Sequence, residues 1–234
     1  MLNFLYNSVD NFLRRAIIVV KGEKMTKSLY SMILSDEVIK RIDSLAADNN
    51  TNRSNLINQI LAEYVSYTTP EKRINKIFAI MNDLVSVGFN PLNEQADRLF
   101  SLKTNLDYKY KPSVKYTVEL YRTYNATIGE LKVTYRSQSH ELVQKLNDFF
   151  RLIIEIERRY LSGATQYTID DTKFVRTFVV PNGNHYSENE IAVAINEYIK
   201  HFDYTMKSYL SNKFSTFYSL QTTYENFLSD SILI

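Results

Sequence analysis

The segment from Thr26 to Tyr67 constrains the fold of this chain more than any other. It begins with residues 27–34, which are predicted to form a strand whose successive side chains point to opposite faces. It continues into two short segments in which apolar residues have helical spacing. A single strand cannot satisfy its own backbone donors and acceptors, so it needs a partner strand. The same strand of a second copy is the simplest partner. We therefore expect a homodimer joined by a two-stranded antiparallel ribbon.

Two short helices are predicted after the strand. Ser35 is placed to cap the first helix, with acidic residues at 36–37 in its first turn, and Asn52 is placed to cap the second. Between them, residues 48–51 tolerate turn and left-handed conformations. The predicted apolar stripes are Val38, Ile42, Leu45 and Ala46 in the first helix, and Leu56, Ile57, Ile60, Leu61, Tyr64 and Val65 in the second. A unit of about forty residues buries too little surface alone, so dimerisation would supply the missing core.

This segment resembles the ribbon-helix-helix family, the Arc, MetJ and CopG type of bacterial repressors. The resemblance covers under a fifth of the chain, and it rests on the alternating strand, the Ile-x-x-Leu-Ala pattern at 42–46 and the Arg-Ser pair at 53–54. In the family the paired strands enter the major groove of DNA. Free amides at the start of the second helix hold a phosphate there.

The resemblance implies a DNA-binding surface formed by the ribbon and by the start of the second helix. Its residues here are Lys27, Leu29, Ser31, Ile33, Asn52, Arg53 and Ser54. Tyr30, Met32 and Leu34 would then face the core. Leu29 and Ile33 depart from the family pattern, because base edges are read by hydrogen bonds and aliphatic side chains only touch thymine methyl groups or pack elsewhere. A ribbon used purely for dimerisation is the competing interpretation.

The chain is predicted to have four parts: residues 1–24, 25–69, 70–102 and 103–234. The apolar run at 16–20 is too short to span a bilayer, and its flank lacks a signal-peptide cleavage pattern. Residues 21–25, Lys-Gly-Glu-Lys-Met, match a purine-rich ribosome-binding site read in frame. We hypothesise that Met25 is the natural start and that residues 1–24 are a leader; an amphipathic arm is the alternative.

An α+β fold is expected after the ribbon-helix-helix segment. Residues 70–102 are predicted to be a helical connector, with one helix from Pro70 towards Gly88 and a short one over 92–102. Alternating runs at 114–120 and 131–135 predict an antiparallel hairpin around a turn near 125–129. Three further helices are expected: one over 139–160, a long one that begins at a capping box at 187–190, and a last one that ends near Asp230. A strand is expected over 174–180. We assign this C-terminal domain to no family.

The hairpin region mixes basic and aromatic side chains, which can hold single-stranded nucleic acid by charge and stacking. The residues are Lys103, Lys109, Lys111, Lys115, Arg122, Lys132 and Arg136, with Tyr108, Tyr110, Tyr121 and Tyr124. An ordinary solvated sheet face is the more common explanation of such a pattern.

Little in the sequence favours catalysis. The three histidines are scattered without metal-ligand spacing, no glycine-rich loop follows a strand, and there is no cysteine. Asp170 is expected to stabilise a turn, and Glu155 and Glu157 are expected to form helix-surface ion pairs with Arg158 and Arg159. We therefore expect a protein that is not an enzyme and that has no metal and no cofactor.

The net charge of +2 is nearly neutral, so attraction for phosphate has to be local. The expected function is that of a bacterial, cytoplasmic, sequence-specific transcription regulator that binds double-stranded DNA as a homodimer or a higher oligomer on DNA. The C-terminal domain would oligomerise or bind an effector or a protein partner, and no membrane is involved. The alternatives are a structural or protein-interaction role, or a partition or relaxase accessory factor of a plasmid or mobile element.

Overall fold

The computed structural model describes residues 31–65, 67–92, 98–122, 126–161, 163–170, 172–180, 184–214 and 216–234. The chain divides into two compact units. The described part of the first ends at Thr69, and the second comprises Pro70–Arg122 and Ala126–Ile234. The second unit is a mixed α+β structure, as expected from the sequence.

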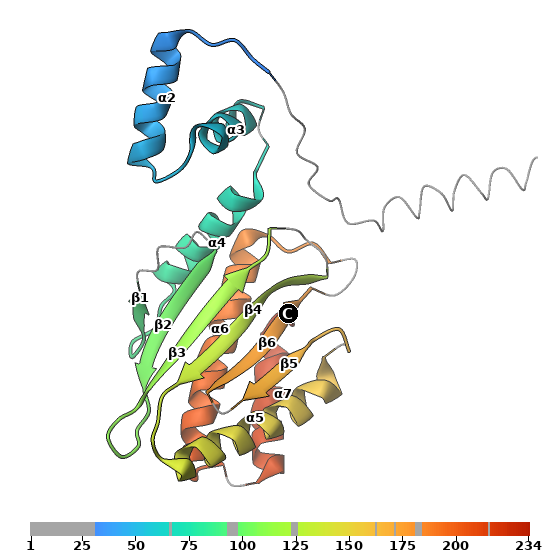
Figure 1. Ribbon diagram of the computed structural model, residues 1–234. Helices are drawn as coiled ribbons and strands as arrows, with labels where there is room; N and C mark the ends of the chain where they lie inside the picture. The colour runs from blue at the N-terminus through green and yellow to red at the C-terminus, as the bar shows by residue number, and fades with distance from the viewer. Residues whose placement is uncertain are drawn as a thin grey trace, which may run out of the picture. The chain divides into compact units, whose positions relative to one another are not determined.

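The first unit contains the helices α2 (Asp36–Asp48) and α3 (Arg53–Tyr64) (Figure 1). Ser35 is the N-cap of α2, although its side chain makes no capping hydrogen bond. Asn50 has a φ of 49°, the left-handed conformation expected in the connection. The two helices share a small cluster of buried side chains, formed by Ile42, Ala46 and Leu56. The predicted helices and their connection are confirmed.

The second unit is built on a six-stranded antiparallel sheet. Its strands are β1 (Asn90–Leu92), β2 (Leu99–Asn105), β3 (Ser113–Leu120), β4 (Thr127–Tyr135), β5 (Tyr167–Asp170) and β6 (Lys173–Val179). Their order across the sheet is β1-β2-β3-β4-β6-β5. The predicted hairpin is therefore confirmed as β3 and β4, which lie at the centre of the sheet.

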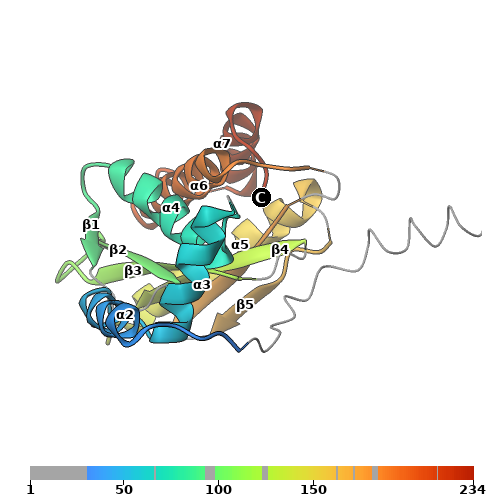
Figure 2. The same cartoon turned by 90° about the horizontal axis from the view of Figure 1, so that it is seen from above.

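Four helices complete this unit: α4 (Pro70–Asp83), α5 (His140–Tyr160), α6 (Glu188–Leu210) and α7 (Phe217–Asp230). Figure 2 shows α4, α6 and α7 on one side of the sheet. The long helix α5 joins the same core, where Phe150 stacks on Phe174 of β6 with ring centroids 5.0 Å apart. Phe202 of α6 lies 5.3 Å from the same ring. Helices α5 and α6 thus pack on the sheet face that carries Phe174.

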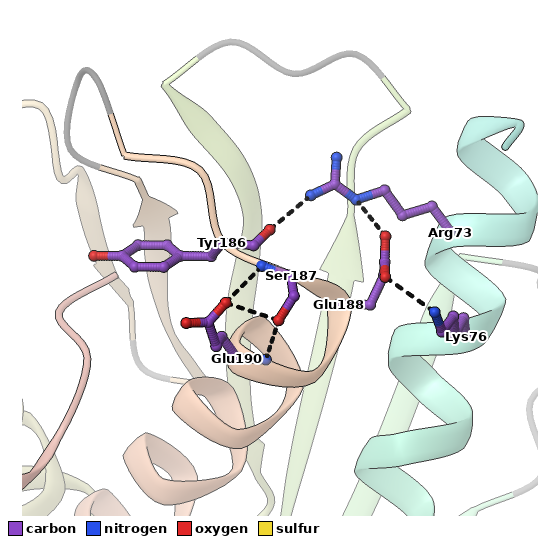
Figure 3. Close-up of polar contacts among 6 residues, drawn as sticks. All are labelled: Arg73, Lys76, Tyr186, Ser187, Glu188 and Glu190. Carbon is purple, nitrogen blue, oxygen red and sulfur yellow. Dashed lines mark hydrogen bonds and ion pairs between the residues drawn. The ribbon is translucent and has the colours of Figure 1, made fainter. Parts of the chain in front are cut away.

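Ion pairs join helix α4 to the start of α6 (Figure 3). Glu188, in the first turn of α6, lies 3.2 Å from the Lys76 ammonium and 3.6 Å from Nε of Arg73. The predicted capping box is confirmed: Ser187 accepts from the backbone amide of Glu190, and the Glu190 carboxylate accepts from Ser187. The hydrogen bond from Lys76 is the largest cause lowering the pKa of Glu188.

The helix predicted over 92–102 is wrong, and the helical connector 70–102 is corrected accordingly. Residues 99–105 form β2, which pairs with β3 over its whole length. Leu102 and Thr104 are buried, whereas Lys103 and Asn105, which follow them, are exposed. This alternation has the period of a strand, but it spans too few residues to be recognised without its partner.

The surface ion pairs predicted for Glu157 are also wrong. Glu157 is fully buried and lies 2.9 Å from Nε of Arg176, a β6 residue that is equally buried. Its carboxylate also accepts hydrogen bonds from the hydroxyls of Tyr167 and Tyr198. Glu155 does form the expected exposed pair with Arg159, at 3.0 Å.

Candidate nucleic-acid interface

The predicted ribbon lies only partly within the described residues. Lys27 and Leu29 lie outside them, and residues 31–35 have no strand assignment in the isolated chain. Ser31 is exposed, and Ile33 is 102 % exposed. Leu34 packs against the Ile42 cluster, which confirms its predicted inward orientation. Met32, also predicted to face the core, is 52 % exposed in the single chain.

The start of α3 presents backbone amides to solvent. The Asn52 side chain accepts from the amide of Asn55 at 2.9 Å, as expected for an N-cap. The amides of Arg53 and Ser54, in the first turn, have no carbonyl behind them within the helix. Helix α3 has no acidic residue in its first turn, so nothing on this turn opposes an incoming anion.

The Arg53 side chain is turned towards the preceding helix. Its Nε donates to Oδ1 of Asp43 at 2.7 Å, and its Nη2 donates to Oδ2 at 2.5 Å. This bidentate pair raises the pKa of Arg53 and lowers the pKa of Asp43, in both cases chiefly through the side-chain hydrogen bonds. The guanidinium lies beside the helix start, but part of its charge is already matched by Asp43.

A group of apolar side chains on α2 and α3 stays exposed, and we call it the apolar face. Its members are Val38, Leu45, Ile60, Leu61, Tyr64 and Val65, with exposed fractions from 42 % to 88 %. They belong to the apolar stripes predicted for the two helices. Only the other members of these stripes pack against each other within the chain. An apolar group of this size on so small a unit is typical of a surface that has a partner.

The basic and aromatic side chains of the hairpin region do not form one surface. Arg122 pairs with Glu71 of α4 at 3.1 Å, and the Tyr121 hydroxyl donates to Glu130 at 3.0 Å. Burial and Glu130 raise the pKa of Tyr121 to about 12. Tyr124 lies outside the described residues. Lys103, Lys115 and Lys132, by contrast, project from one face of the sheet, as their alternation with buried neighbours shows.

The described residues show no other arrangement typical of a reactive centre. They contain no group of three or more acidic, histidine or cysteine side chains that could hold a metal ion. A shallow groove between α6 and α7 contains His201, whose ring stacks on Phe227 at 4.3 Å. Burial lowers the pKa of His201 to about 4, so the ring is neutral at pH 7. Asp170 accepts from the amides of Thr172 and Lys173, which confirms its role in a turn.

Comparisons with protein-family models, with curated proteins and with solved structures found no match to this chain. Among the described helices, none has the length and apolar character needed to cross a membrane.

Proposed function

We propose that this chain is a homodimeric DNA-binding regulator whose first unit pairs with that of a second copy. The strand over 27–34 would pair across a two-fold axis and enter the major groove. The amides at the start of α3 would bind flanking phosphates. The second unit would provide a rigid body for oligomerisation or for a partner.

The observation that carries the proposal is the mismatch between the small buried cluster and the apolar face of α2 and α3. Three buried side chains do not stabilise a unit of this size. Burying an aliphatic side chain completely is worth about 1.5–3 kcal/mol, so completing the burial of half-exposed Val38, Leu45 or Ile60 adds on the order of 1 kcal/mol each. A second copy offers the same surface and supplies this burial symmetrically.

The start of α3 supports the choice of DNA as the ligand. Asn52 caps the helix without occupying the amides of Arg53 and Ser54, and the helix dipole favours an anion beside them. The Arg53 guanidinium is close by, although it is held by Asp43. A phosphate that approached the helix start would compete with Asp43 for this guanidinium.

The Arg53–Asp43 pair gives a two-sided test of DNA binding. Arg53→Ala is expected to weaken binding to duplex DNA and to make the dependence on salt less steep by about 0.9 per lost phosphate contact. Asp43→Asn is expected to strengthen binding, because it frees the guanidinium and removes a negative charge. Fluorescence anisotropy with labelled duplex at several salt concentrations measures both. Neither exchange is expected to alter the fold substantially, since the pair is exposed and exposed ion pairs contribute little to stability.

A ribbon that serves only dimerisation is the second candidate, because Ile33 is fully exposed and Arg53 already has an ionic partner. In that case the protein remains a dimer, and both exchanges leave affinity for DNA unchanged. Ser31→Ala and Ile33→Ala distinguish the two further. Sequence preference is lost with these changes if the ribbon reads bases, and it is retained if the ribbon only joins the subunits.

A further inference from the structure

A groove runs between the neighbouring helices α6 and α7 (Figure 2). The two helices are antiparallel, since Tyr198 contacts Phe227, and His201, one turn further along α6, contacts Tyr224, one turn earlier in α7. The groove has a volume of about 530 Å³, within the range of about 300–1,000 Å³ that is typical of small-molecule sites. Its lining includes Glu197, Lys200, His201 and Tyr204 of α6 and Phe227 and Asp230 of α7.

The middle of the groove is aromatic and uncharged. The His201 ring stacks on Phe227 with ring centroids 4.3 Å apart. This ring is neutral at pH 7, because burial lowers the pKa of His201 to about 4, so it does not repel a cation. Tyr204, one turn further along α6, is 58 % exposed. Such rings offer apolar area to an alkyl chain and attract a cation through their faces.

One end of the groove carries negative charge that is only partly balanced. Because the helices are antiparallel, Glu197 and Asp230 lie at the same end. Glu197 pairs with Lys200 at 2.8 Å, whereas Asp230 forms no ion pair with another described residue. Helix α7 ends at Asp230 and has no basic residue in its last turn. The last carbonyls of a helix carry partial negative charge, so this end of the groove favours a cation.

We infer that this groove binds a linear aliphatic amine, with an ammonium group beside Asp230 and the alkyl chain along the rings of Phe227 and Tyr204. An ammonium group has three donors, and the Asp230 carboxylate together with the last carbonyls of α7 can accept them. The stretch of α6 from Glu197 to Tyr204 is about 10 Å long, so the groove accommodates a chain and not only a single ion.

Other ligands fit this groove less well. The described part of the chain contains no group of three or more acidic, histidine or cysteine side chains that could hold a metal ion. An anion would meet the negative end of α7, and the ammonium of Lys200 is already paired with Glu197. The chain has a net charge of +2, which does not attract cations in general. Affinity for an amine therefore has to come from the groove itself.

The test measures binding of putrescine to the full chain by isothermal titration calorimetry, with the uncharged diol of the same chain length as the control ligand. Asp230→Asn removes the unpaired charge at the end of the groove. Asp83→Asn is the matched control, because Asp83 is the last residue of α4, another helix of 14 residues, and does not line the groove. Lys200→Gln acts in the opposite direction, since it removes a positive charge and releases Glu197.

Putrescine is expected to bind the wild-type chain, and the diol is not. Asp230→Asn is expected to weaken affinity for putrescine by about tenfold or more, because a hydrogen bond to a charged group is lost. Asp83→Asn is expected to leave affinity unchanged, and Lys200→Gln is expected to raise it. Tyr204→Leu, which removes an exposed ring, is expected to weaken affinity about two- to fivefold. Thermal unfolding of Asp230→Asn is expected at the wild-type temperature or above it, since a carboxylate at a helix C-terminus does not stabilise the helix.

Equal affinities of Asp230→Asn and Asp83→Asn for putrescine would overturn the inference. Equal binding of putrescine and the diol, or no binding of putrescine by the wild-type chain, would overturn it as well. If magnesium chloride bound with the same dependence on Asp230, the groove would be a site for inorganic cations and the amine would be refuted. The inference does not depend on DNA binding, because Asp230 and Arg53 belong to different units of the chain. Anisotropy with Arg53→Ala and calorimetry with Asp230→Asn therefore test the proposed function and this groove separately.

Discussion

Replacement of Glu157 by Gln is the sharpest test of how the second unit is held together. The Glu157 carboxylate accepts three hydrogen bonds, from Arg176 Nε at 2.9 Å, from the Tyr167 hydroxyl at 2.8 Å and from the Tyr198 hydroxyl at 2.7 Å. The guanidinium also donates to the backbone oxygen of Ile234 and lies 4.2 Å from the centre of the Tyr198 ring. Helix α5, β6 and α6 therefore meet at one buried carboxylate.

The expected cost follows from burial. A glutamine can still accept from Arg176 and Tyr167 through its amide oxygen, but its NH₂ group then faces the Tyr198 hydroxyl, and the fully buried guanidinium loses the negative charge of the carboxylate. Breaking a buried pair by removing one partner costs about 3–5 kcal/mol. Weaker hydrogen bonds from the tyrosines add about 1 kcal/mol. Since domains have about 5–15 kcal/mol of stability, Glu157→Gln is expected to remove about a quarter of it or more.

Urea denaturation followed by far-UV circular dichroism measures the loss, and Glu155→Gln is the matched control. Glu155 is on the same helix but its pair with Arg159 is exposed, so its replacement is expected to cost less than about 1 kcal/mol. Combining Glu157→Gln with Arg176→Met is expected to recover on the order of 3 kcal/mol relative to the sum of the single changes. A small cost for Glu157→Gln, similar to that of the control, would refute this reasoning.

Two further predictions concern the sheet and the pH dependence of stability. A Cβ on Gly129 would lie 2.2 Å from the carbonyl oxygen of Glu119, so Gly129→Ala should lower the free energy of unfolding by about 1–3 kcal/mol, whereas Gly163→Ala, with open space around it, should not. The pKa of His201 is lowered from 6.5 to about 4, so the unfolded chain takes up the proton first and stability should fall as pH drops from 6.5 towards 4. The loss is at most about 3 kcal/mol, at about 1.4 kcal/mol per pKa unit. His201→Phe keeps the stack on Phe227 but removes the titrating group, so the free energy of unfolding, measured by urea denaturation, should fall less between pH 6.5 and pH 4. An unchanged fall over this range would contradict the assignment.

The elements predicted correctly are those whose signals are local. The apolar spacing of α4 and α5 and the capping box at Ser187 each lie within a few turns of one helix, and β3 and β4 adjoin along the chain. Strand β2 was missed because its identity depends on pairing with β3. The role of Glu157 was missed because its partner Arg176 comes from another element, and the neighbouring arginines in the sequence suggested a surface pair instead.

In the candidate site, too, the local features could be predicted from the sequence and the contacts between elements could not. The caps and turns of α2 and α3 follow from short sequence signals at Ser35, Asn50 and Asn52. The pairing of Arg53 with Asp43, ten residues earlier, could not be read from helical spacing, because the two residues lie on different helices. Residues 31–34 have no strand assignment within the single chain, so the ribbon stays a prediction.

Disulfide cross-linking at position 31 tests the central claim, the pairing of two copies through their ribbons, most directly. The chain has no cysteine, so Ser31→Cys introduces a single thiol near the middle of the predicted strand. Across a two-fold axis the two copies of this position would approach within the roughly 4.4–6.8 Å Cα separation of a disulfide. The account predicts a covalent dimer upon mild oxidation of Ser31→Cys and none for Ser229→Cys on α7, with the unmodified protein sedimenting as a dimer. A monomer at all concentrations, or equal cross-linking at both positions, would contradict it.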